Sequence, residues 1–184
     1  MITLIRRLTE LADQQASVAT MLCDVPSVLR PVLAREEWLP ANHKAPHPDH
    51  YQQYLLYLDP QGRFSIVSFV WGPGQETPIH DHMTWGVVGQ LRGNEVSTNY
   101  ARSADGTLKV TGVHTLKPGE TIAFSPAQGD IHQVRNDSYD VSVSIHIYGG
   151  DIGRTKRHRY DAATGVAHAF ISGYSPASVV AWNA

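Results

Sequence analysis

The chain of 184 residues is 42% hydrophobic and carries a formal net charge of −2. These values fit one folded domain over residues 1–184, and they argue against the broad basic surface that nucleic acid requires. No apolar run approaches the length of a transmembrane span, so we expect no membrane partner and a cytoplasmic protein. The single cysteine, Cys23, excludes an intramolecular disulfide and a thiolate metal site.

The first 50 residues predict a helical extension followed by a loop. Three leucines recur at helical spacing and indicate an amphipathic helix over residues 2–18, namely Leu4, Leu8 and Leu11. A second helix is expected to begin at Asp24 and to run toward Trp38, and Pro31 favours its division into two short turns. Residues 42–50 read as a loop with three histidines that we expect to be exposed: His43, His47 and His50.

Residues 51–160 change to the period of two that is typical of strands. The expected strands are 54–58, 64–71, 85–91, 95–100, 108–116, 121–124, 131–136 and 141–148, with a turn at Asp59–Gly62 between the first two. Many short strands separated by turns predict an all-β sandwich or barrel. Residues 161–184 are expected to form a C-terminal tail that wraps on this barrel.

Two histidines at strand spacing predict a metal site at His80-Asp81-His82. Because residues i and i+2 of a strand point to the same side, His80 and His82 aim at one point while Asp81 faces away. His132 on a neighbouring strand completes a three-nitrogen site that leaves other coordination positions open. The same pair also fits two ordinary polar residues on a solvated strand, so the spacing of the surrounding residues matters.

That spacing matches the two motifs of cupins. The matching positions around the histidines are Gly74, Gly93, Gly129 and Asn136. The chain resembles a cupin over residues 64–148, which implies a jelly-roll β-barrel behind the helical extension. Many cupins add a glutamate ligand shortly after the histidine pair, but Gly86 stands at that position. The expected metal shell is therefore three neutral histidines, which by itself also suits zinc chemistry.

Ser144-Ile-His146-Ile-Tyr148 alternates polar and branched apolar residues. Ser144, His146 and Tyr148 therefore share one face of a strand, which we expect to face inward, where they can hydrogen-bond to one another. This combination resembles the thiol dioxygenases of the cysteine dioxygenase family, which are cupins with a Ser-His-Tyr triad. The resemblance covers most of residues 50–160.

The resemblance implies one Fe(II) per chain, held by His80, His82 and His132, and catalytic roles for the triad. The family adds both atoms of O₂ to the sulfur of a small mercapto-carboxylate and gives a sulfinate. Tyr148 would hydrogen-bond to the substrate or to oxygen. Some members join a cysteine to the active-site tyrosine, but the aligned position is Gly86, so no such crosslink is expected.

The substrate carboxylate needs a cation, and vertebrate members use an arginine on the strand before the metal hairpin. This chain has Gln53 there and resembles the Gln-type bacterial branch, whose members often prefer 3-mercaptopropionate. The branch takes its arginine from beyond the triad strand, and Arg157 matches best by spacing, although Arg154 and Arg159 stay open. Cysteine and mercaptosuccinate are the alternative substrates.

Two other classes of protein also fit parts of the pattern. A non-catalytic cupin that binds a small ligand would not need the Ser-His-Tyr triad. A metal-dependent cupin hydrolase or isomerase would need a general base beside the metal, and the motif positions offer no carboxylate. The sequence predicts no particular oligomeric state.

Overall fold

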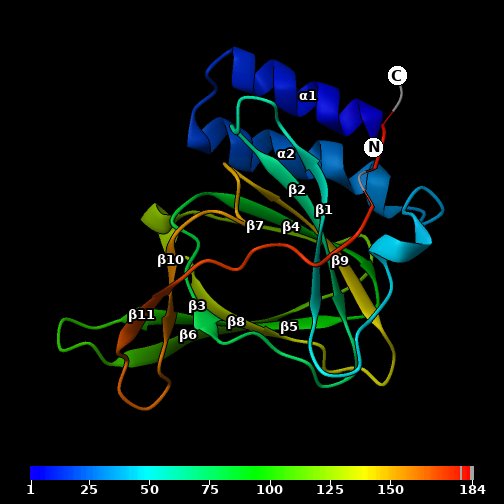
Figure 1. Cartoon of the computed structure of the whole chain (residues 1–184). Coiled ribbons are helices and arrows are strands. Elements are labelled where there is room, and N and C mark those ends of the chain that lie inside the picture. Colours follow the sequence, from blue (N-terminus) through cyan, green and yellow to red (C-terminus); the bar gives the residue numbers. More distant parts are fainter. Residues whose placement is uncertain (179, 183–184) are drawn as a thin grey trace.

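Two antiparallel sheets form the protein, with two helices against the outside of one sheet (Figure 1). The computed structural model describes residues 1–178 and 180–182. The first sheet has the order β1 Gln52–Leu58, β2 Ser65–Trp71, β9 Ser142–Tyr148, β4 Gly86–Arg92 and β7 Thr121–Phe124. The second has the order β11 Ala167–Phe170, β10 Arg157–Tyr160, β3 Ile79–His80, β8 Ile131–Arg135, β5 Glu95–Arg102 and β6 Leu108–Leu116. The prediction of an all-β jelly roll with an N-terminal helical extension is confirmed.

The helices α1 Ile2–Asp13 and α2 Val18–Leu33 depart from the sequence prediction at three boundaries. Helix α1 is shorter than the expected range 2–18. Helix α2 begins well before Asp24, because the side chain of Ser17 accepts a hydrogen bond from the backbone N–H of Thr20 at 3.1 Å and caps the helix. It also ends before Trp38. The predicted start at Asp24 was therefore wrong.

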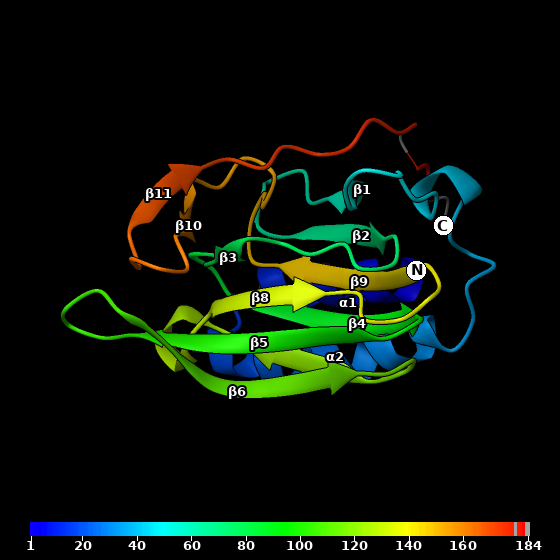
Figure 2. The ribbon, with the colours of Figure 1, turned by 90° about the horizontal axis from the view of Figure 1, so that it is seen from below.

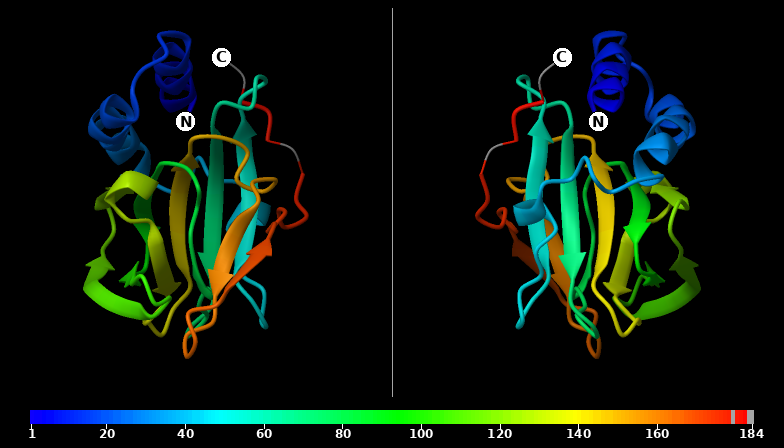
Figure 3. Two further views of the ribbon diagram at one scale, coloured as in Figure 1. Left: turned by 90° about the vertical axis from the view of Figure 1, so that its left-hand side faces the viewer. Right: turned by 90° about the vertical axis from the view of Figure 1, so that its right-hand side faces the viewer.

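Helix α2 continues through two prolines, Pro26 and Pro31, so the predicted division into two turns was also wrong. A proline inside a helix costs about 3 kcal/mol. The apolar face of α2 offsets this cost, because Val25 and Leu29 are fully buried against the first sheet. Gly89 on β4 permits this close packing, since a Cβ there would lie 2.6 Å from the Cδ1 of Leu33. The helices thus close the outer face of the sheet, as seen edge-on in Figure 3.

Strand β9 is buried on both faces and separates two kinds of environment. Its apolar residues Val143, Ile145 and Ile147 have no exposed surface and belong to the core beneath the helices. On its other face, His146 and Tyr148 line a cavity together with His80 and His132 of the second sheet. Figure 2 shows the two sheets from below, with the second sheet nearer the viewer. The fold therefore directs the alternating polar side chains of one central strand toward the second sheet.

The three histidines of the expected loop differ in exposure. His43 lies in the short 3₁₀ helix η1 Ala41–His43 and is fully buried, with its ring edge-on to Tyr54 at 5.8 Å between centroids. The expectation of exposure was therefore wrong for His43, because the loop packs onto strand β1. His50 is exposed as expected.

The segment from residue 161 contains the strand β11, which pairs with β10 along its whole length. Beyond β11 the chain crosses strand β1, where Ser175 N–H donates to the carbonyl of Gln53 at 2.8 Å. Trp182 Nε1–H donates to the carbonyl of Leu56 at 2.8 Å. The part of the expected tail at residues 179 and 183–184 lies outside the described residues. None of the described helices is long and apolar enough to span a membrane.

Candidate metal centre

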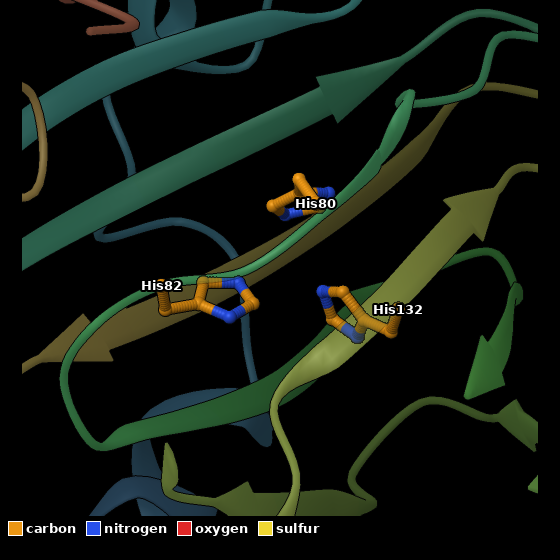
Figure 4. A group of neighbouring side chains, drawn as sticks. All are labelled: His80, His82 and His132. Atoms are coloured by element: carbon orange, nitrogen blue, oxygen red, sulfur yellow. The ribbon is translucent and has the colours of Figure 1, made fainter. Parts of the chain in front are cut away.

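Three histidines converge between the sheets, as Figure 4 shows. His80 ends the short strand β3, His82 follows it in the loop, and His132 on β8 pairs directly with His80 across the sheet. The ring centroids of each pair are 4.8 Å apart, and one ligand nitrogen from each residue lies within 4.8 Å of the other two. Strand geometry alone does not produce this arrangement, because His82 lies beyond the two-residue strand.

Every ring in this cluster has a hydrogen bond at Nδ1. His80 Nδ1–H donates to the carbonyl of Pro78 at 2.9 Å, and His82 Nδ1–H donates to the carbonyl of Asp130 at 3.1 Å. The Nδ1 of His132 lies 3.2 Å from the hydroxyl of Ser97. Such partners fix the tautomer and leave Nε2 as the metal ligand. The Nε2 of His82 is buried and has no hydrogen-bond partner within the described part of the chain, which fits a metal ligand.

The burial of the cluster keeps its imidazoles neutral. Burial lowers the pKa of His80 to about 4, and burial together with the neighbouring histidines lowers the pKa of His82 well below its usual value. The pKa of His132 is lowered for the same two reasons. Because a metal binds the neutral ring, the cluster is in its ligating form at neutral pH.

Two aspartates hold the loop that carries His82. Asp81 points away from the cluster, and its carboxylate accepts hydrogen bonds from the backbone and ring of His158 and from the hydroxyl of Tyr160. The carboxylate of Asp130 accepts from the backbone N–H groups of His82 and Met83. Sequence reasoning gave His158 no role. Through its hydrogen bonds to Asp81, His158 on β10 holds the loop that carries His82 against a strand from near the C-terminus.

Phe124 occupies the place where a fourth protein ligand could stand. A Cβ at Gly86 would lie 2.4 Å from the Cζ of Phe124, so no larger side chain fits there without displacing the ring. The ring also packs on His82, with centroids 4.4 Å apart. The cluster therefore consists of three histidines among the described residues, and a metal bound to it keeps positions free for exogenous ligands.

Ser144, His146 and Tyr148 form a continuous hydrogen-bonded chain on the inner face of β9. The Ser144 hydroxyl lies 2.8 Å from His146 Nε2, and His146 Nδ1 lies 2.8 Å from the Tyr148 hydroxyl. Burial raises the pKa of Tyr148 far above its usual value, so the phenol keeps its proton. Its ring stacks on His82 at 5.6 Å between centroids, which places the hydroxyl chain beside the metal cluster.

The structure distinguishes the three arginines near residue 157. Arg154 is 88% exposed and Arg159 is exposed, whereas Arg157 is only 4% exposed. Its guanidinium donates to the carbonyl of Ile152 at 2.9 Å and stacks on Phe170, while its Nε is buried without a partner. No carboxylate of the described residues lies within ion-pairing distance of it. Burial accordingly lowers the pKa of Arg157.

Arg157 and Gln53 line the same cavity as His80 and His132. The Gln53 amide donates to the hydroxyl of Ser172 at 3.1 Å and to the carbonyl of Gly173 at 3.0 Å, so it also holds the segment after β11. Sequence reasoning missed the aromatic walls of this cavity, which are Tyr51, Phe69 and Phe170. Their contacts come from segments far apart in the chain, and no local motif marks them.

The chain matches the family model of cysteine dioxygenase type I over residues 2–178. The chain belongs to this family. Membership implies a dioxygenase of the oxidoreductase class that uses non-haem iron, and the three-histidine cluster suits such a metal. A member of this family would bind a small thiol and O₂.

Solved structures with a similar fold are more distant. An uncharacterized conserved protein with a double-stranded β-helix domain from Klebsiella pneumoniae subsp. pneumoniae MGH 78578 shares 16% identity at a TM-score of 0.49, covering 60% of this chain and 87% of that one. An RmlC-like cupin protein from Desulfovibrio desulfuricans shares 20% identity at a TM-score of 0.45, covering 60% of this chain and 93% of the other. Structural similarity at this level gives no information about the reaction.

Proposed function

We propose that this protein is a non-haem Fe(II) thiol dioxygenase whose substrate is a small mercapto-carboxylate, with 3-mercaptopropionate as the preferred one. The reaction is RSH + O₂ → RSO₂H, which balances without a further reductant. The observation that carries the proposal is a single cavity lined by His80, His132, Tyr148 and Arg157. Bound to the histidines, Fe(II) would supply open positions for the thiol sulfur and O₂ and the redox chemistry that joins them.

Arg157 is the proposed carboxylate-binding residue. A buried guanidinium without a counter-ion is costly, and a bound carboxylate offsets that cost with two charge-assisted hydrogen bonds. The unpartnered Nε and the stacking on Phe170 leave the planar group ready to receive such a ligand. Aromatic side chains close around the cavity, which favours a small substrate.

The charges around the cavity favour 3-mercaptopropionate over the two alternatives. Cysteine carries an ammonium group, but no aspartate or glutamate is among the described residues that line the cavity. Mercaptosuccinate carries a second carboxylate, but Arg157 is the cavity's one lining lysine or arginine within the described chain. The lack of a lining carboxylate also disfavours a metal-dependent hydrolase or isomerase with a carboxylate base.

Tyr148 is the proposed hydrogen-bond donor to the reacting groups. Its hydroxyl stands at the end of the Ser144–His146 chain, and its high pKa keeps the proton in place for donation. A donor held in a buried site stabilises developing negative charge without reorganisation. We propose that Gln53 shapes the carboxylate end of the cavity through the segment that it holds.

An oxygen-electrode comparison on iron-loaded protein tests the proposal. We expect O₂ uptake with 3-mercaptopropionate, a lower kcat/KM with cysteine and with mercaptosuccinate, and one sulfinate formed per O₂. Zinc-loaded protein is the control and should consume no O₂. Absence of uptake with all three thiols, at one iron per chain, would contradict the proposal.

A further inference from the structure

A tyrosine near the C-terminus, Tyr174, packs against the turn that precedes β10. It follows strand β11 and lies outside the lining of the substrate cavity. Its hydroxyl donates to the carboxylate of Asp151 at 2.6 Å and accepts from the backbone N–H of Gly153 at 3.0 Å. Burial and the hydrogen bond to Asp151 raise the pKa of Tyr174, so the phenol keeps its proton. One hydroxyl group therefore holds the chain on both sides of Ile152.

The N–H of Gly153 and the carbonyl of Ile152 belong to one peptide group. The described chain contains no cis peptide bond, and in a trans peptide the N–H and the C=O point in opposite directions. On the carbonyl side, the guanidinium of Arg157 donates to Ile152 at 2.9 Å. A single peptide group thus joins Tyr174 on one side to Arg157 on the other. The orientation of this peptide decides where the carbonyl oxygen lies, and with it the guanidinium.

The carbonyl of Ile152 sets the direction of the guanidinium in the substrate cavity. It is the one protein acceptor of Arg157 among the described residues. The guanidinium carbon also lies 4.6 Å from the ring centroid of Phe170. This stacking restrains the plane of the group but not its rotation within that plane. A carboxylate that binds with two parallel hydrogen bonds needs that rotation fixed, because it engages two N–H groups at once.

The same hydrogen-bonded chain joins two opposite charges. It runs from Arg157 through the Ile152–Gly153 peptide and the hydroxyl of Tyr174 to the carboxylate of Asp151. Every donor in it points from the guanidinium toward the carboxylate, so the bonds polarise one another. The other charged partner of Asp151 is the 88% exposed Arg154 at 3.7 Å, and such an exposed pair contributes little. Loss of the Tyr174 hydroxyl would interrupt the chain at its centre.

Two glycines bring Tyr174 against the peptide that it binds. A Cβ at Gly153 would overlap the ring of Tyr174, so glycine lets the ring lie directly against the backbone. Gly173 has a φ of +68°, which favours glycine, and its N–H donates to the carbonyl of Gly153 at 3.0 Å. The amide of Gln53 donates to Ser172 and Gly173. The segment that carries Tyr174 therefore contacts both proposed substrate-binding residues, directly or through one peptide.

We propose that Tyr174 is a positioning residue for substrate recognition, which orients the Ile152–Gly153 peptide and thereby directs the N–H groups of Arg157 into the substrate cavity. Its effect on the choice among thiols rests on the proposed thiol dioxygenase function. The placement of the guanidinium does not rest on that function, so the two claims can fail separately. Because Tyr174 lies outside the cavity lining, its loss should affect substrate binding rather than the chemical step.

The first test observes the Nε–H group of Arg157 by NMR, with ¹⁵N-labelled arginine and zinc in place of iron. The signal is assigned by its absence in Arg157→Lys. Tyr174→Phe should shift this signal and should speed its exchange with water by about tenfold. The matched control is Ser178→Ala, which removes the contact of the C-terminal segment with Asn42 and leaves the peptide untouched. A wild-type signal in Tyr174→Phe would overturn the proposal, as would an equal change in Ser178→Ala.

The second test titrates the zinc-loaded protein with propionate, which has the carboxylate but no sulfur. Propionate should shift the Arg157 signal in the wild type, and its Kd should be about tenfold weaker in Tyr174→Phe. Gly153→Ala should weaken binding similarly, because it displaces the ring while the hydroxyl is kept. An equal Kd in the wild type and both variants would overturn the role in recognition. If propionate leaves the wild-type signal unchanged while Tyr174→Phe alters it, the proposed carboxylate site fails and the positioning role stands.

The third test compares two thiols on the iron-loaded enzyme. Tyr174→Phe should raise KM for 3-mercaptopropionate by about tenfold and should change kcat by less than about twofold. With 2-mercaptoethanol, which has no carboxylate, KM should stay near the wild-type value. Tyr148→Phe should show the opposite pattern, a lower kcat with little change in KM. An equal rise in KM for both thiols in Tyr174→Phe would indicate a general disturbance of the cavity and would contradict the proposal.

Discussion

The two faces of strand β9 differ in chemistry although one backbone carries both. On the outer face, Val143, Ile145 and Ile147 pack beneath the helices with no exposed surface. On the inner face, polar side chains alternate with these residues and join one hydrogen-bonded chain beside the metal cluster. The comparison shows that a strand buried on both faces can separate stability from chemistry, residue by residue. Substitutions on the two faces should therefore affect different measurements.

The largest effect on activity is expected at the three histidines of the cluster, which lie beside the inner face of β9. Replacing His80, His82 or His132 with alanine removes one of three neutral nitrogens and leaves too few protein ligands for Fe(II). We expect a severe loss of bound iron and of activity in each variant, measured by metal analysis and O₂ uptake. Full iron occupancy in all three variants would contradict the assignment.

Removal of the inner-face hydroxyl should be nearly as severe for turnover but harmless to iron binding. Tyr148→Phe deletes a buried donor, and we expect kcat to fall by about 10²-fold with iron content unchanged. His146→Asn or Ser144→Ala should lower kcat less, because the hydroxyl remains. An unchanged kcat in Tyr148→Phe with saturating thiol would remove the tyrosine from the reaction.

Loss of Arg157, the proposed carboxylate-binding residue, should affect substrate binding more than the chemical step. Arg157→Ala should cost about 2–4 kcal/mol in kcat/KM for 3-mercaptopropionate, because a buried bidentate charge pair is lost. Lysine at this position should restore only part of the activity, since a point charge lacks the planar fork.

Two controls sharpen the Arg157 result. The exposed Arg154 serves as a matched variant, and Arg154→Ala should have little effect. With 2-mercaptoethanol, which has no carboxylate, Arg157→Ala should change the rate little. Equal losses on both thiols would instead indicate that Arg157 supports the fold or the metal centre.

A smaller effect is expected at Gln53, whose amide is neutral and partly engaged with the segment at Ser172 and Gly173. Gln53→Ala should cost about 1 kcal/mol in kcat/KM and should alter the ratio of rates among the three thiols. Gln52, one residue earlier, hydrogen-bonds to the carbonyls of His50 and Tyr51 and lies outside the cavity lining, so Gln52→Ala should leave this ratio unchanged. If Gln53→Ala also keeps the wild-type ratio of rates among the three thiols, Gln53 does not contribute to selectivity.

The smallest effect on activity should come from the outer face of β9. Ile145→Ala creates a cavity beneath the helices and should lower the free energy of unfolding by about 2–5 kcal/mol. Iron content and kcat should stay at wild-type values at temperatures where the variant is folded, because the inner face is unchanged. Thermal unfolding and O₂ uptake measure the two quantities. A loss of kcat without a loss of stability would contradict the assignment of stability to the outer face of β9 and of activity to its inner face.

The parts of the site that the sequence predicted are those with a local signal. Alternation placed Ser144, His146 and Tyr148 on one face, and motif spacing brought His132 toward His80. The choice of Arg157 among three arginines needed the strand β10, whose four residues carry no apolar alternation. Strand alternation does not separate Arg157 from Arg159, because residues i and i+2 point to the same side, and only the packing around β10 buries Arg157 against Phe170 and leaves Arg159 exposed.

The parts that escaped prediction depend on contacts between distant segments. Phe124 and Tyr51 reach the site from two separate segments, and each is an ordinary residue in its own local sequence. The start of helix α2 had a local signal in Ser17, but Asp24 before Pro26 offered a competing one. Tertiary packing against the first sheet decided between them.

The most direct test of the central claim is the fate of isotopically labelled oxygen during oxidation of 3-mercaptopropionate by the iron-loaded protein. With ¹⁸O₂ in unlabelled water, mass spectrometry should find both oxygen atoms of the sulfinate labelled. At equal protein concentration, the His132→Ala variant should form no labelled sulfinate. A sulfinate with one labelled atom, or with none, would contradict a dioxygenase at the three-histidine site.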